Sequence, residues 1–366
     1  MEKELFSLYN NFLNFLEKSY AKESENWTGV NKKVKKAKLK KILNTEKLTF
    51  IQFAEVLREY YYSHYFLSPN KTFLDIWLSK VIIKFLLKKD LIKIKNNKIF
   101  FKKNFSNFFI KQMNEEEIRK KLEKMGIKLN YKLSFVENLS GKKKFQWKER
   151  YDQIPISLSS SIFLISKILE NFPIKGKILF IGDDDFSSIF LSLVEPKFDI
   201  TVVDIDKELL DVIEEIKKDY SIKNITTVNC DIRKSTIKEK NFIGFVTNPP
   251  YTLYGLKSFL KFGENSICSY GGKGIVIVGE EGMMNRLLLL QKFINKKNFL
   301  IREIINGKIS YPFIGIYKED IFNREELKKL GLKISGNYLF ASLCVIEKIP
   351  WKVSEKYNPK NIYNYL

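Results

Sequence analysis

The sequence predicts an α/β protein in two parts: a C-terminal doubly wound domain with a mostly parallel sheet, and a smaller N-terminal α+β domain. Helices alternate with β-rich runs from Ser159 onward, and three helices followed by a hairpin fill the first hundred residues. Charge divides the chain too: residues 1–150 hold 34 Lys and Arg against 16 Asp and Glu, and residues 151–366 hold 30 against 26. This asymmetry indicates two domains with different roles.

The composition is typical of a globular protein, with 45% hydrophobic and 29% charged residues. No run approaches the roughly 18–20 apolar residues of a membrane span, and the first ten residues mix charged with apolar types, unlike a signal peptide. We therefore expect no membrane association and a cytoplasmic location. Cys230, Cys268 and Cys344 lie far apart without zinc-ligand spacing, so we expect neither a disulfide nor a metal.

The N-terminal pattern is typical of a winged helix. Thr49 and Gln52 form a capping box that opens a helix, and Asn96-Asn97 is a turn between two short β-rich runs. The expected elements are helices at 3–18, 49–63 and 72–89 and strands at 91–94 and 98–101. We predict a winged-helix-like domain over residues 1–125, a linker over 126–150 and a catalytic domain over 151–366.

Two interpretations of the basic half stay open. Lysines on a winged helix can bind nucleic acid, but here they are scattered rather than gathered on one helix face, which fits a solvated surface equally well. Winged helices also serve as dimerisation modules, and the fold alone does not decide between these roles. We expect a homodimer and do not favour a nucleic-acid partner.

The C-terminal part alternates helices with strands, which indicates a parallel, doubly wound sheet. A last β-rich segment suits the antiparallel strand of methyltransferase sheets, so we expect a methyltransferase-like Rossmann domain. The expected helices cover about 159–171, from 187, 207–218, 254–262 and 283–295, and the expected strands are 177–181, 199–203, 225–228, 242–247, 274–278, 300–305 and 339–346.

Ligands of such sheets bind beyond the carboxyl ends of the strands, so the residues that follow each strand are the candidates. Asp204 is placed to accept hydrogen bonds from both hydroxyls of a ribose, with Ile205 beside it. Asp231 is placed to accept from the amino group of an adenine, while the backbone at Ile232 contacts the ring edge. Asp is common in turns and helix caps, but two such residues at successive strand ends favour a nucleoside site.

The fourth strand ends in Asn248-Pro249-Pro250-Tyr251. The prolines stiffen the backbone, so a carbonyl and the Asn248 side-chain oxygen can accept from a target amine, while Tyr251 offers an aromatic face to a base or a cation. The alternative is a proline-stiffened turn with a buried tyrosine.

The first strand ends in Gly182-Asp183-Asp184-Asp185, where an ordinary methyltransferase has a glycine-rich loop for the methionine part of S-adenosylmethionine. Each acid would repel the carboxylate of that donor by roughly 1 kcal/mol at ~4 Å in water, and by more at lower dielectric. Decarboxylated S-adenosylmethionine presents only cations, so the pattern favours aminopropyl transfer over methyl transfer. We expect one of the three acids to cap the following helix.

Together, Tyr151-Asp152-Gln153, Gly182 to Asp185, Asp204-Ile205-Asp206 and the Pro-Pro turn resemble the branched-chain polyamine synthase family, the N4-bis(aminopropyl)spermidine synthases. The resemblance covers roughly residues 145–350, and the N-terminal winged-helix pattern is similar to that family's first domain. It implies transfer of aminopropyl groups from decarboxylated S-adenosylmethionine to a secondary amine of spermidine or a related polyamine. The products would be a branched-chain polyamine and methylthioadenosine.

The resemblance also implies residue roles. Asp184 is similar to the catalytic base of the family, and Asp152 and Glu281 would hold the polyamine, together with Asp185 and Tyr251. Gly182, Asp183, Asp204, Ile205, Asp231, Ile232 and Asn248 would contact the nucleotide.

One departure keeps rival functions open. The family usually has Asp where this chain has Asn248, and Asn-Pro-Pro-Tyr is also similar to the motif of amino-methyltransferases. An S-adenosylmethionine-dependent amino-methyltransferase acting on nucleic acid or protein is therefore the alternative. A winged-helix regulator with a ligand-sensing Rossmann domain is the third reading.

Overall fold

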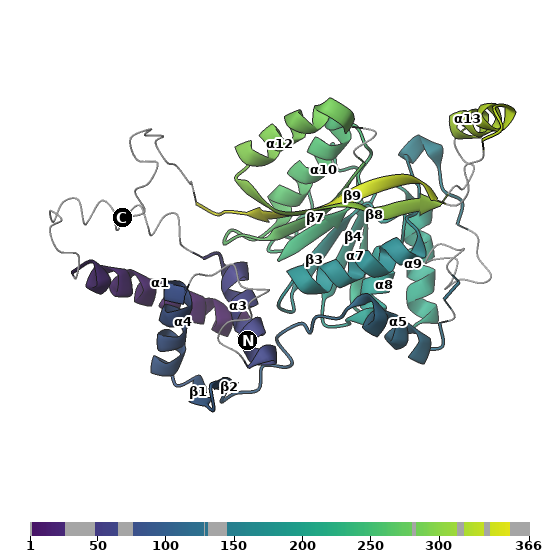
Figure 1. Ribbon diagram of the computed structural model, residues 1–366. Helices are drawn as coiled ribbons and strands as arrows, with labels where there is room; N and C mark the ends of the chain where they lie inside the picture. Colours follow the sequence, from purple (N-terminus) through teal and green to yellow (C-terminus); the bar gives the residue numbers. More distant parts are fainter. Residues whose placement is uncertain are drawn as a thin grey trace, which may run out of the picture.

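The structure is a computed structural model and describes residues 2–25, 48–64, 76–127, 129–130, 145–279, 283–312, 318–332 and 337–351. Within these residues the chain forms a small two-stranded sheet and a seven-stranded sheet with strand order β5-β4-β3-β6-β7-β9-β8. Figure 1 shows the large sheet between two layers of helices, with the N-terminal helices at one end of it. This is the α/β Rossmann-like architecture that the sequence predicts.

The N-terminal elements follow the expected order. They are α1 (Glu2–Glu25), α3 (Phe50–Ser63), α4 (Ile76–Lys88), β1 (Ile92–Lys95), β2 (Lys98–Phe101) and α5 (Glu115–Lys124). Thr49 and Gln52 form the predicted capping box of α3, with both reciprocal hydrogen bonds present. Asn96 and Asn97 turn the hairpin in the left-handed region, where Asn is tolerated. The order of elements is that of a winged helix, and the winged-helix assignment itself stays a prediction.

The C-terminal elements alternate as expected. The helices are α7 (Leu158–Asn171), α8 (Ser187–Val194), α9 (Lys207–Asp219), α10 (Leu253–Ser266), α12 (Leu287–Lys296) and α13 (Lys318–Lys329), with 3-10 turns η1 (Glu149–Tyr151) and η2 (Met284–Arg286). The strands are β3 (Lys177–Ile181), β4 (Asp199–Asp204), β5 (Ile225–Asn229), β6 (Gly244–Thr247), β7 (Lys273–Val278), β8 (Phe299–Pro312) and β9 (Asn337–Lys348).

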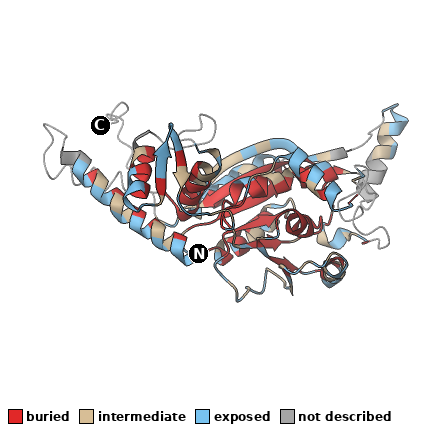
Figure 2. Ribbon diagram, turned by 90° about the horizontal axis from the view of Figure 1, so that it is seen from below, coloured by how far each residue is buried: buried red, intermediate tan, exposed pale blue. Residues whose placement is uncertain are grey.

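Burial on both faces explains why the central strands are almost wholly apolar. Ile178 and Phe180 of β3 join one hydrophobic cluster, and Leu179 and Ile181 join another on the opposite face. Figure 2 shows this buried interior running through the sheet and the helices that cover it. Strands β3 to β7 are parallel, and β9 and β8 follow as antiparallel strands. The carboxyl ends of β3, β4, β5 and β6 therefore meet at one edge of the sheet.

Strand β8 differs most from its prediction. It was expected to end at Ile305, but it continues to Pro312 through register shifts that include the step from Ile305 to Ile309. Asn306-Gly307 looks like a turn in the sequence, yet Gly307 takes a φ of 65° inside the strand. The extension carries Tyr311 towards the edge of the sheet where the candidate residues lie.

The N-terminal half packs on the opposite edge of the sheet. Thr49 and Gln52, at the start of α3, donate to the Glu347 carboxylate, and Arg58 donates to the carbonyl of Leu169 at 2.9 Å. Glu347 pairs with Lys273, the first residue of β7, so these contacts lie at the amino end of the parallel strands. The N-terminal helices are thus positioned away from the carboxyl ends (Figure 1).

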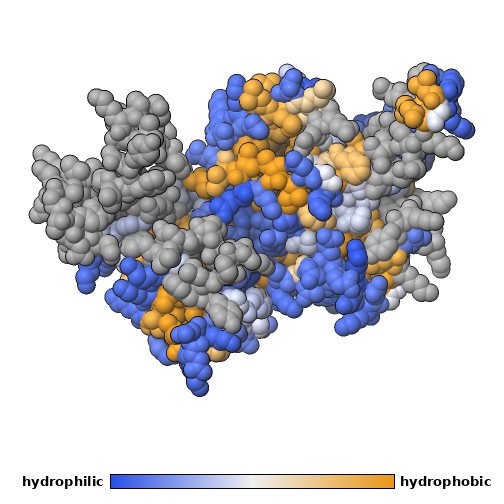
Figure 3. All heavy atoms as spheres, viewed as in Figure 1, coloured by the Kyte–Doolittle hydropathy of each residue, from blue (hydrophilic) through white to orange (hydrophobic). Residues whose placement is uncertain are grey.

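Two findings concern the surface. Among the described residues, no helix is long and apolar enough to cross a membrane. Figure 3 shows apolar side chains on the helical layer of α10 and α12, and the exposed ones include Leu288 and Leu289 of α12.

Candidate active site

The three-acid turn after β3 is buried, although it is made of charged residues. Asp183, Asp184 and Asp185 are only 1%, 9% and 5% exposed. Gly182 opens the turn at a φ of 70°, a conformation that glycine adopts without strain. Since buried carboxylates are costly unless they are paired or hydrogen-bonded, the partners of each one decide what the turn can do.

Asp183 caps the next helix, as expected of one of the three acids. Its carboxylate accepts from the backbone N–H of Ser188 at 3.2 Å and from the Ser188 hydroxyl. These bonds satisfy donors at the start of α8 and hold the turn against that helix. Asp183 therefore has a structural partner of its own.

The carboxylates of Asp184 and Asp185 do not cap the helix as that of Asp183 does. The Asp184 backbone carbonyl accepts from the Trp147 indole at 2.9 Å, which fixes the turn but leaves the carboxylate to other partners. Asp185 Oδ1 accepts from the Ser187 hydroxyl at 3.2 Å. Its second oxygen, Oδ2, is buried and has no hydrogen-bond partner among the described residues. A buried acceptor without a donor is a place for a ligand N–H.

Asp204 adds a further buried carboxylate at the end of β4. It accepts from the backbone N–H groups of Asp206 at 2.8 Å and Asp183 at 3.3 Å. Burial raises the pKa of Asp204 to about 6. The pKa of Asp185 also rises to about 6 by burial, and burial followed by the charges of Asp185 and Asp204 raises the pKa of Asp184 well above its usual range. The acid turn and Asp204 thus bring several buried carboxyl groups together.

Residues 145–153 cover this turn. Phe145 packs edge-on against Phe186 at a centroid distance of 5.5 Å. Lys148 Nζ pairs with Asp206 at 2.7 Å, and the Gln153 amide donates to the same carboxylate at 3.1 Å. Asp152 follows η1 in the left-handed region, and its charge, with those of Asp184 and Asp185, contributes to raising the pKa of Tyr251 after burial. Asp152 therefore lies near enough to Tyr251 for its charge to act on that hydroxyl, as do Asp184 and Asp185.

Asn248, Tyr251 and Tyr311 form the wall opposite. Asn248 Oδ1 accepts from the Tyr311 hydroxyl at 2.9 Å and from the Tyr251 hydroxyl at 3.2 Å, and the two hydroxyls contact each other. We expected Asn248 to offer this oxygen to the target amine. In the structure, however, this oxygen already accepts hydrogen bonds from two tyrosine hydroxyls.

Gly279 makes room for the Tyr251 ring. A Cβ at this position would lie 2.1 Å from Tyr251 Cδ2, so even alanine forces the ring to move. We expect Gly279→Ala to lower kcat/KM by at least about tenfold through displacement of this wall, a typical cost of a small misplacement in a site. Steady-state kinetics measure this effect. An unchanged kcat/KM with an unchanged melting temperature would show that the position of Tyr251 does not matter.

The predicted nucleoside residues lie at the ends of β4 and β5. Ile205 is 39% exposed and lines an open hollow of about 590 Å³ together with Cys230 and Asp231. The Asp231 carboxylate pairs with Arg233 at 2.8 Å, and this hydrogen bond is the main cause that lowers its pKa to about 2. An adenine amino group would therefore have to share this carboxylate with Arg233. Sequence reasoning missed Arg233, although its spacing of two residues from Asp231 was visible.

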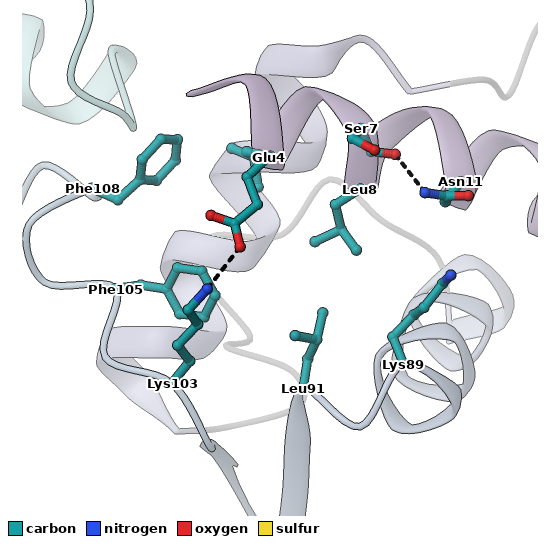
Figure 4. Close-up of a pocket in the computed structure, with 10 residues that line it drawn as sticks. Glu4, Ser7, Leu8, Asn11, Lys89, Leu91, Lys103, Phe105 and Phe108 are labelled. Carbon is teal, nitrogen blue, oxygen red and sulfur yellow. Dashed lines mark hydrogen bonds and ion pairs between the residues drawn. The ribbon is translucent and has the colours of Figure 1, made fainter. Parts of the chain in front are cut away.

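Other parts of the chain fit the proposed chemistry less well. A hollow of about 170 Å³ lies between α1 and the hairpin, but its lining includes Lys89 and the paired Glu4 and Lys103, which does not suit a polycation (Figure 4). His64 ends α3, and its ring contacts the carbonyl of Ile99 at 3.1 Å in the N-terminal half. Glu281 lies outside the described residues.

The three cysteines form no disulfide, and Cys268 and Cys344 are buried. Across the part of the chain that the structure describes, no group of three or more His, Cys, Asp or Glu side chains is arranged to hold a metal ion.

Comparison with known proteins adds independent findings. The family model described as the branched-chain polyamine synthase A C-terminal domain matches residues 136–363. The chain is 30% identical over 255 residues to the N(4)-bis(aminopropyl)spermidine synthase of Methanocaldococcus jannaschii. The aligned region covers 65% of this chain and 71% of that protein. It is 25% identical over 194 residues to the enzyme of the same name from Thermococcus kodakarensis, covering 52% of this chain and 54% of that one.

A solved structure shares the fold. A crystal structure of a branched-chain polyamine synthase mutein from Thermus thermophilus, in complex with N4-aminopropylspermidine and 5'-methylthioadenosine, matches with a TM-score of 0.51 and 15% identity. The match covers 87% of this chain and 93% of that one, so it includes the N-terminal half. On the match of the family model to most of its length, the chain belongs to the branched-chain polyamine synthase family and is an enzyme of the aminopropyltransferase type.

Proposed function

We propose that the protein transfers an aminopropyl group from decarboxylated S-adenosylmethionine to a secondary amine of spermidine or a related polyamine. The observation that carries this proposal is the group of buried carboxylates at the ends of β3 and β4, in which Asp185 Oδ2 has no hydrogen-bond donor among the residues that the structure describes. Cations at this position would relieve the mutual repulsion of the acids. The names of the relatives and the ligands named with the Thermus structure support the same reaction.

The donor would lie across the ends of the first strands. Asp204 would accept from the ribose hydroxyls, Ile205 would pack beside the nucleoside, and Asp231 and the backbone of Ile232 would contact the adenine. Gly182 and Asp183 would shape the turn beneath the sulfonium. A donor that kept its carboxylate would bring a like charge to Asp184 and Asp185, which costs several kcal/mol at a protein-like dielectric.

The acceptor would enter from the side of Asp152 and Tyr251. Asp152, Asp185 and Glu281 would bind the ammonium groups of the polyamine, and Tyr251 would present its ring to one of them. The spacing of these charges would determine which polyamine nitrogen reaches the donor. Part of the binding energy would thereby be used to place this nitrogen next to the reacting carbon.

The chemical step needs a base. An alkyl amine has a pKa of about 10, near that of Lys, so the acceptor arrives mostly protonated. Asp184 would take that proton, and the freed nitrogen would attack the propyl carbon bound to sulfur. The C–S bond breaks, its electron pair stays on sulfur, and methylthioadenosine leaves as a neutral thioether. Asn248, in the wall that it forms with Tyr251 and Tyr311, would contact the donor.

A product analysis tests the proposal. The protein is incubated with spermidine and either decarboxylated S-adenosylmethionine or S-adenosylmethionine, and the products are identified by mass. We expect aminopropyl adducts and methylthioadenosine from the decarboxylated donor alone. Methylation from S-adenosylmethionine of an added RNA, DNA or protein would support the amino-methyltransferase instead, and no adduct with either donor would refute both.

The same proposal includes the wider organisation of the chain. We propose a winged-helix-like domain over 1–125, a linker over 126–150 and a catalytic domain over 151–366, assembled as a homodimer in the cytoplasm. Cysteines that form no disulfide, such as Cys344, fit a reducing compartment. Light scattering on the purified protein measures the oligomeric state, and a monomer mass would contradict the dimer.

A further inference from the structure

Tyr311 reaches the candidate site from a strand that sequence reasoning left outside it. Its side chain is 2% exposed, and its hydroxyl donates to Asn248 Oδ1 at 2.9 Å. The Tyr251 hydroxyl lies within 3.2 Å of the same oxygen and contacts the Tyr311 hydroxyl. Two hydroxyl groups from different elements thus converge on one amide oxygen.

This convergence decides which way the Asn248 amide points. An amide has one acceptor oxygen and one donor nitrogen, and the hydroxyls occupy the oxygen. The other neighbour is Asp185, whose ionised carboxylate can only accept. Burial raises the pKa of Asp185, and the Asn248 side chain acts in the opposite direction, which agrees with the amide nitrogen facing Asp185.

The amide in turn orients Asp185. Ser187 donates to Oδ1 of this carboxylate at 3.2 Å, and Oδ2 is left buried without a partner among the residues described. With Oδ1 held by Ser187 and the Asn248 amide beside the carboxylate, Oδ2 stays available as an acceptor. That is what a site for an ammonium group requires.

Tyr311 itself is firmly held. Its neighbour Ser310 accepts from the backbone N–H of Ser157 at 2.8 Å and donates its own N–H to the Ser160 hydroxyl at 2.8 Å. Tyr311 also pairs with Leu339 in the ladder between β8 and β9. The phenol is therefore attached to the start of α7 and to the sheet, which are rigid elements.

We propose that Tyr311 is a positioning residue for the acceptor, acting through the Asn248 amide to hold Asp185 ready for an ammonium group of the polyamine. This inference rests on the proposed function for the identity of the acceptor. It also gives Asn248 a role that an aspartate would not fill: an amide at this place donates to Asp185, whereas a carboxylate would add another negative charge beside it.

A double-mutant cycle tests the route through Asn248. Tyr311→Phe, Asn248→Ala and the double variant are compared for the KM of spermidine, kcat, and the affinity for methylthioadenosine. We expect Tyr311→Phe to raise the KM of spermidine by about tenfold, the size of one buried hydrogen bond, with the methylthioadenosine affinity within about twofold of the wild type. The double variant should have the same KM for spermidine as Asn248→Ala alone, because Tyr311 has no effect once the Asn248 amide is removed.

Additive effects of the two substitutions, or a loss of methylthioadenosine binding equal to the loss for spermidine, would overturn the proposal. Tyr9→Phe is the matched control, since Tyr9 is also buried but donates to the Leu48 carbonyl in the N-terminal half. If Tyr311→Phe does not fold, the same cycle is run with Tyr251→Phe. Calorimetric binding of spermidine is measured in parallel, so a protein that transfers no aminopropyl group still reports on Tyr311 separately from the proposed reaction.

Discussion

Asp184→Asn is expected to lower turnover by about 10²- to 10⁴-fold, the usual contribution of a positioned general base. Asparagine keeps nearly the same shape but cannot take the proton that the acceptor amine must lose. The affinity for methylthioadenosine should stay within about threefold, because the contacts of the nucleoside are expected to come from Asp204 and its neighbours. Single-turnover kinetics and equilibrium binding separate the two effects.

The control for this substitution is Asp211→Asn, on the exposed side of α9, which should leave both quantities unchanged. Turnover of Asp184→Asn near that of the wild type would remove Asp184 from the chemical step. Equal losses of turnover and of nucleotide binding would show that the turn had been distorted instead.

Asp185→Asn is expected to stabilise the ligand-free protein while weakening polyamine binding. Burial raises the pKa of Asp185 to about 6, from an ordinary value near 4. The folded state therefore binds the proton more tightly than the unfolded state, and the stability from this group is present below pH ~4 and is lost as the pH rises through about 6. At pH 8 the substitution should raise the free energy of unfolding by about 1 to 3 kcal/mol.

Urea unfolding at pH 5 and pH 8 measures this effect, and the gain should be larger at pH 8. Asp231→Asn is the control of opposite sign: pairing with Arg233 lowers the pKa of Asp231, so removal of this carboxylate should give no gain in stability at pH 8. Spermidine should raise the melting temperature of the wild type more than that of Asp185→Asn. A less stable Asp185→Asn protein at pH 8 would mean that the carboxylate is not under electrostatic strain.

The sequence alone predicted the parts of the fold that depend on local patterns. Apolar runs such as Lys177–Ile181 are strands because both faces are buried, and Thr49 with Gln52 starts a helix by a local exchange of hydrogen bonds. Parallel strands bring their carboxyl ends together, so the Asp183–Asp185 turn and Asp204 could be placed side by side without coordinates. Helix chemistry also predicted that one of the three acids would cap the next helix, although it did not show that this would be Asp183.

The rest depends on contacts between distant residues. Tyr311 is 63 positions from Asn248, and its place in the site depends on the irregular extension of β8 beyond Gly307. Trp147 and Lys148 lay in a stretch predicted as linker, yet they bind the acid turn and Asp206. The available indication in the sequence that this segment packs against the protein was Trp147, an aromatic residue that follows a run of lysines. The pattern of β-rich runs does not show which side chain a strand brings to a site.

The acid turn is expected to select a donor without a carboxylate. The direct test is to measure the dissociation constants of S-adenosylmethionine and decarboxylated S-adenosylmethionine with the same preparation at low ionic strength, where charges are least screened. The decarboxylated donor is expected to bind at least about tenfold more tightly, a difference of about 1.4 kcal/mol. Equal affinities, or tighter binding of S-adenosylmethionine, would contradict it.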